Sequence, residues 1–103
     1  MRTVRLSKTF NEQLIDLIDF GEQRYGSDLA EQKKNLVLAA IEITLAAHPR
    51  VKRLHPDLGL VVYPITNTPF VVLYDFDDVE LRVHFVLHRH AALDAIDPKA
   101  AVW

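Results

Sequence analysis

The sequence has no cysteine, which excludes both a disulfide framework and a thiolate metal site. Stability must come from packing, and a reducing compartment is the simplest setting for such a chain. An excess of positive charge is missing too, because 12 Lys and Arg stand against 14 Asp and Glu, for a net charge of -2. Any contact with nucleic acid must therefore be local rather than a coat of bulk positive charge.

Long apolar runs are also absent, and none approaches the ~20 residues that cross a bilayer. No basic segment followed by an apolar one opens the chain, so we expect a soluble, cytoplasmic protein. The chain has 103 residues, 50% of them hydrophobic, and shows no internal repeat or linker. We expect a single domain over residues 1–103.

Apolar residues recur at helical spacing in the first half of the chain and predict two helices. Ser7 offers a hydroxyl to cap the first helix, over about residues 8–25, and Gly26 ends it before a second helix over about residues 27–47. We therefore expect a helical hairpin. Its apolar stripes consist of Phe10, Leu14, Leu17 and Ile18 on the first helix, and Leu29, Leu36, Val37, Ala40, Ile41 and Leu45 on the second.

Strands are predicted on both sides of this hairpin. A short one over residues 3–6 precedes it, and three more follow the break at His48-Pro49, over residues 58–65, 70–76 and 79–88. Asn67-Thr68-Pro69 and Asp77-Asp78 supply the turns between them. The predicted fold class is α+β: a small antiparallel sheet packed on an N-terminal helical hairpin, in the order β-α-α-β-β-β, with a short C-terminal tail. The hairpin covers one sheet face and leaves the other open.

The last predicted strand alternates apolar and polar residues almost perfectly, which is typical of a half-buried strand. We expect one of its faces to be core and the other to be polar and functional. The core face would consist of Val79, Leu81, Val83, Phe85 and Leu87, and the polar face of Glu80, Arg82, His84 and His88.

Three segments after the predicted hairpin resemble, in their order and spacing, the RelE/ParE superfamily of bacterial toxins. They are Gly59-Leu60-Val61-Val62-Tyr63-Pro64, Phe70 to Tyr74, and Phe85 to His90. The resemblance implies the toxin of a type II toxin-antitoxin (plasmid stabilisation) module. It also implies a cognate antitoxin whose disordered segment folds across the toxin in a hetero-oligomer, and contact with operator DNA only through that antitoxin. It implies no cofactor.

The resemblance leaves three activities open. A ParE-like toxin arrests growth by inhibiting DNA gyrase and is no enzyme; this is the favoured branch. A RelE-like toxin is a ribosome-dependent mRNA endoribonuclease, in which His84, His88, Arg89 and Arg53 would surround the scissile phosphate. This branch is weakened because cations are missing at positions where such toxins often carry them. The positions hold Val61, Val62, Val72, Leu73 and Asp75 in this sequence. The third reading is a chain that has lost its toxicity and only binds antitoxin.

Further residues are predicted to bind a partner, each beside a structural alternative. Arg50 and Lys52 lie in the densest basic stretch, which could equally be a solvated loop. Arg82 could hold a partner's carboxylate or pair with Glu80 or Asp75 within the sheet. His90 and the tail residues Leu93, Ile96 and Trp103 complete the set. We predict no metal site, because His84, His88 and His90 spread along the strand and no carboxylate completes a familiar ligand set.

Overall fold

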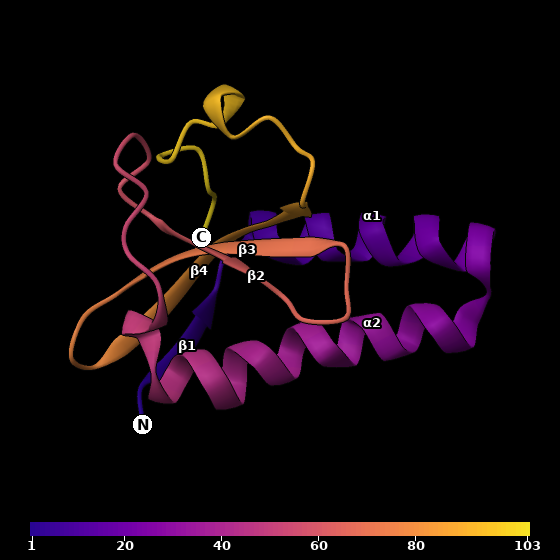
Figure 1. Cartoon of the computed structure of the whole chain (residues 1–103), viewed down its shortest axis with the longest axis horizontal. Helices are drawn as coiled ribbons and strands as arrows, with labels where there is room; N and C mark the ends of the chain where they lie inside the picture. Colours follow the sequence, from indigo (N-terminus) through magenta and orange to yellow (C-terminus); the bar gives the residue numbers. More distant parts are fainter.

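A computed structural model describes all 103 residues and confirms the α+β fold with the predicted order of elements. The four strands form one sheet in the order β1-β4-β3-β2, and the two long helices lie across one side of it (Figure 1). The elements are β1 (Thr3–Leu6), α1 (Lys8–Tyr25), α2 (Ser27–Ala39), β2 (Val61–Pro64), β3 (Phe70–Phe76) and β4 (Glu80–His88). A π-helical turn (Ala40–Leu45) prolongs α2, and short 3-10 turns cover Pro49–Val51 and Leu93–Ala95.

The strands pair as a mixed sheet. β2, β3 and β4 form an antiparallel meander, as the turn residues predict, whereas β1 pairs with β4 in parallel. Parallel neighbours need a long connection, and here both helices, the connector, β2 and β3 lie between β1 and β4. None of the helices is both long and apolar enough to span a membrane.

Local capping explains where the hairpin begins and turns. Ser7 precedes α1, and its Oγ accepts a hydrogen bond from the backbone N–H of Phe10 at 2.8 Å. The same hydroxyl donates to the backbone oxygen of His84 at 2.6 Å, which ties the start of the helix to β4. Gly26 has a φ of 91°, a conformation that favours glycine, and joins the two helices without a longer loop.

The buried stripe of the second helix agrees with the predicted one except at two residues. Leu29 and Leu36 were expected in the core but are 39% and 38% exposed. The other predicted residues lie in the core as expected: Val37, Ile41 and Leu45 are buried, and Ala40 packs against the main cluster. Ala30 is buried in place of Leu29, because one residue corresponds to ~100° of rotation about a helix and turns Leu29 away from the core. Leu29 is consequently free to line a surface groove.

A β-bulge in β4 overturns the predicted single core face of that strand. Leu73 of β3 pairs with Phe85, yet the next residue, Tyr74, pairs with Val83, so His84 has no partner across the ladder. One extra residue reverses which side chains point to which face. Leu81, Val83 and Val86 therefore pack toward the helices, while Phe85 and Leu87 pack on the opposite side. Val79, the remaining member of the predicted core face, is 73% exposed in the turn.

The two sides of the sheet can now be named. The helix face carries the main apolar cluster, formed with α1 and α2. The tail face carries a second cluster of Leu58, Leu60, Val71, Leu73 and Phe85, against which Leu93, Ile96 and Ala101 of the C-terminal tail pack. The expectation of an open second face is therefore wrong. The tail returns across the sheet (Figure 1), and Val102 accepts hydrogen bonds from the backbone N–H groups of Lys8 at 2.7 Å and Thr9 at 3.3 Å.

Candidate functional site

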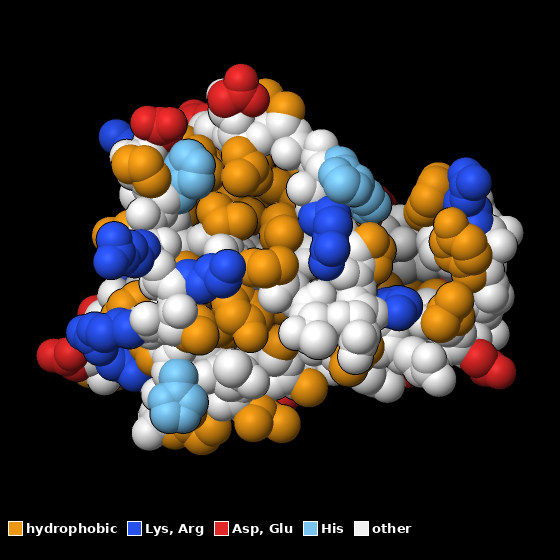
Figure 2. All heavy atoms as spheres, viewed as in Figure 1, with side chains coloured by type: hydrophobic (Ala, Val, Ile, Leu, Met, Phe, Trp, Pro, Cys, Tyr) orange, Lys and Arg blue, Asp and Glu red, His pale blue; other side chains and the backbone are white.

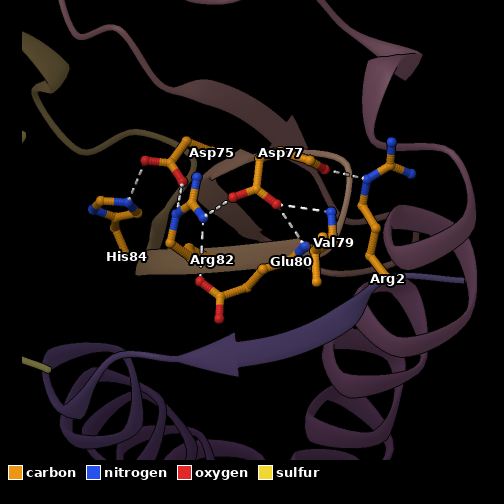
Figure 3. A network of polar contacts seen from close by, with 7 residues as sticks. All are labelled: Arg2, Asp75, Asp77, Val79, Glu80, Arg82 and His84. Carbon is orange, nitrogen blue, oxygen red and sulfur yellow. Dashed lines mark hydrogen bonds and ion pairs between the residues drawn. The ribbon is translucent and has the colours of Figure 1, made fainter.

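Arg82 joins three carboxylates on the tail face (Figure 3). Its Nε donates to Asp75 at 2.5 Å, and its Nη1 donates to Asp77 at 2.9 Å and to Glu80 at 3.2 Å. The hydrogen bond to Asp77 is the main cause that raises the pKa of Arg82 above its ordinary value. Hydrogen bonds from Arg82 and from the backbone of Val79 and Glu80 lower the pKa of Asp77 to about 2. Arg82 is thus held by ion pairs with carboxylates of the same chain.

His84 belongs to the same network and is covered by the end of the chain. Its Nε2 lies 3.0 Å from Asp75 Oδ2, and its ring meets the Trp103 ring edge-on with 4.8 Å between centres. The side chain is 12% exposed, and its Nδ1 is buried without a hydrogen-bond partner. Arg5 lies over the Trp103 ring at 5.0 Å. Trp103 therefore restricts access to the imidazole.

The structure does not bring the four predicted ribonuclease residues together. The pocket beside His84 is lined by Asp75, Trp103 and Lys99 among others, but by none of His88, Arg89 and Arg53. His88 pairs with Phe70 and lies on the helix face, because the bulge at His84 reverses the faces to which the following side chains point. The Nη2 of Arg89 donates to the backbone oxygen of Thr68 at 2.8 Å. Arg53 is exposed on the connector after α2.

A second feature is a groove of about 510 Å³ between the helices and the start of β3, here called the hairpin groove. Its exposed apolar side chains are Phe20, Tyr25 and Leu29, with exposures of 56%, 66% and 39%. Figure 2 shows hydrophobic side chains at the tip of the hairpin, with Lys, Arg and His side chains on the other side of a hollow. Sequence reasoning missed the groove, although two aromatic residues outside the buried stripe of α1 were an available signal.

Basic residues lie at one end of the hairpin groove. Lys33, His88, Arg89 and His90, here called the basic rim, line a second hollow over the turn before β3, which shares Lys33 and His88 with the groove, and no carboxylate lines it. Lys33 Nζ donates to the backbone oxygen of Asn67 at 2.5 Å, so the cation is positioned against the turn. The His88 and His90 ring centres are 5.2 Å apart. An apolar groove with basic residues at one end is complementary to an amphipathic segment that carries acidic residues at one end.

The remaining predicted partner-binding residues fall in two places. Leu93 and Ile96 pack inward on the tail face, and Trp103 contacts His84, so the apolar anchors of the tail are used within the chain. Arg50 and Lys52 are exposed on the connector. Nowhere does the structure group three or more His, Asp or Glu side chains so that they could hold a metal ion.

The helical hairpin packed on one small sheet, in the order β-α-α-β-β-β, is the α+β architecture predicted from the sequence. The model of the family described as "ParE toxin of type II toxin-antitoxin system, parDE" matches residues 4–93, and the chain belongs to this family. A solved structure titled "Chromosomal ParDE TA system from P. aeruginosa" has the same fold. It matches with a TM-score of 0.75 and 12% identity, over 85% of this chain and 96% of that chain. No curated protein matches the sequence.

Proposed function

We propose that this protein arrests growth by binding and inhibiting DNA gyrase, without chemistry of its own, in a plasmid-stabilisation type of module. The match to the ParE family supports this proposal, and the separation of His84 from His88, Arg89 and Arg53 weighs against RNA cleavage. Cleavage of mRNA requires an acid or base and several cations around one phosphate, in a site open to RNA. Here His84 is hydrogen-bonded to Asp75 and covered by Trp103. RNA cleavage is the runner-up, and it would require the tail to leave.

We further propose that a cognate antitoxin neutralises the chain through the hairpin groove and forms a hetero-oligomer with it. An amphipathic helix would place apolar side chains against Phe20, Tyr25 and Leu29, and its acidic residues against the basic rim. Phe20 and Tyr25 are more than half exposed in the chain alone, so covering them removes apolar surface from water. Operator DNA would be contacted through the antitoxin.

Gyrase-catalysed supercoiling of relaxed plasmid tests the target. Purified chain, shown to be folded by its thermal transition, should inhibit the reaction, and the antitoxin encoded beside it should relieve the inhibition. No inhibition by folded chain would contradict the proposal. A parallel translation extract then separates the two alternatives, because mRNA cleavage there would establish the ribonuclease, and its absence would favour a chain that has lost toxicity.

The groove is tested by the double substitution Phe20→Ser and Tyr25→Ser. Antitoxin affinity measured by calorimetry should fall at least about tenfold, because two exposed anchors of the groove are lost. Ile15→Ser is the matched control, since Ile15 is 60% exposed on the same helix but does not line the groove. Equal losses in the two variants, or unchanged affinity of the double variant, would place the antitoxin elsewhere on the chain.

A further inference from the structure

The connector between α2 and β2 is held firmly at both ends. At its start, Pro49 is buried and its backbone oxygen accepts a hydrogen bond from the Tyr74 hydroxyl at 2.7 Å. At its end, Leu54 bridges to Val61. The residues between these anchors, 50–53, are all exposed, and we call them the connector ledge. Side chains on a backbone held at two points lose less conformational freedom on binding than those on a loose loop.

The ledge carries three cations, Arg50, Lys52 and Arg53, and none of them forms an ion pair. Arg2 joins them from the other end of the chain: the guanidinium groups of Arg2 and Arg50 lie 5.5 and 5.1 Å from the centre of the same ring, Phe76. Arg2, from the start of the chain, therefore lies beside Arg50 of the ledge. Figure 2 shows several Lys and Arg side chains over this connector and beside the β3–β4 turn.

The acidic residues beside the ledge do not neutralise it. Asp77, in the neighbouring turn, directs its carboxylate to Arg82 and to the backbone N–H groups of Val79 and Glu80. Arg2 reaches only the backbone oxygen of Asp77, at 2.6 Å. Asp57 and Asp78 are exposed and make no ion pair. The guanidinium and ammonium groups of the ledge thus remain available to an external anion.

We propose that the connector ledge binds the phosphodiester backbone of a nucleic acid. The chain as a whole carries a net charge of -2, so the attraction is confined to this one side and needs several phosphates at once. A backbone with a regular repeat of charges meets that need, and contacts to phosphates alone are independent of base sequence. This binding goes beyond the proposed inhibition of gyrase and requires neither the hairpin groove nor the tail.

Fluorescence anisotropy with a labelled DNA duplex and a labelled single-stranded RNA tests the proposal across a salt series. The triple variant Arg50→Gln, Lys52→Gln, Arg53→Gln should bind at least about tenfold more weakly at low salt. For the duplex, the slope of log affinity against log salt should fall by up to about 2.7, at about 0.9 per lost phosphate contact. Arg53→Gln alone should lower that slope by about 0.9. Tighter binding in either arm supports the proposal and identifies the nucleic acid.

The matched control is Lys8→Gln, Arg24→Gln, Lys99→Gln, which removes the same charge from exposed residues outside the ledge. Its affinity should change by less than about threefold, because bulk charge contributes less than the local contacts. Three results would overturn the proposal: no binding by the unmodified chain at low salt, equal loss in the two triple variants, or competition by polyglutamate as effective as that by the nucleic acid. The last result would identify an acidic protein surface as the occupant.

Discussion

The two faces of the sheet are built differently. The helix face is closed by long helices over a cluster of 15 buried residues, whereas the tail face is closed by an irregular tail over a cluster of 5. The tail face also holds the polar network centred on Arg82 and His84. Apolar burial therefore supplies most of the stability on the helix face. On the tail face, directional contacts have a larger share in deciding where the tail lies.

The largest expected effect comes from a cavity on the helix face. Ile41 is fully buried in the main cluster, so Ile41→Ala should lower the free energy of unfolding by about 3 kcal/mol, measured by urea denaturation. Leu93→Ala on the tail face is the paired measurement, with an expected loss of about 1 kcal/mol, because Leu93 is only partly buried. Losses of equal size would show that the two faces contribute equally to the free energy of unfolding.

The next effect comes from the centre of the polar network. Arg82→Ala leaves Asp75, Asp77 and Glu80 without their shared cation and should cost on the order of 2 kcal/mol, reduced by the partial exposure of the network. Lys34→Ala breaks an exposed ion pair with Glu31 on α2 and should cost less than about 0.5 kcal/mol. If the two variants unfold at the same urea concentration, the network adds no more than a surface pair.

The smallest effect is the pH dependence of Asp77. Its folded pKa of about 2 lies below the ordinary value of 3.8, so the folded state favours the charged form. This contribution to stability is present above about pH 4 and is lost as the pH falls toward about 2. Asp77→Asn should lower the melting temperature at pH 7 and weaken its fall on acidification. Asp78→Asn, which removes a neighbouring carboxylate without an ion pair to Arg82, is the control. Parallel acid curves for the unmodified chain and Asp77→Asn would contradict the assignment.

Tyr74 illustrates a side chain whose role the sequence indicates only in part. Its strand position and phenol predict a buried residue with one hydrogen-bond partner, and the structure confirms this by its full burial and its bond to Pro49. Burial is the main cause that raises its pKa to about 12. The partner itself lies 25 residues away on the connector, and no local pattern identifies it.

Local chemistry in the sequence was sufficient for the elements, their order and the family. Ser7 and Gly26 mark the ends of α1, the turn residues separate the strands, and the order of segments indicates the ParE relationship. These features depend on residues close together in the chain, for which periodicity and capping are informative.

Tertiary structure alone decided which face each functional side chain occupies. The bulge at His84 exists only through the pairing of β4 with β3, and it places His84 and His88 on opposite sides despite a spacing that predicts one side. Docking of Trp103 likewise depends on contacts with Arg5 and His84, at the far end of the chain and on another strand. Alternation within a single strand carries no information about its partner, so these placements had to come from contacts between distant residues.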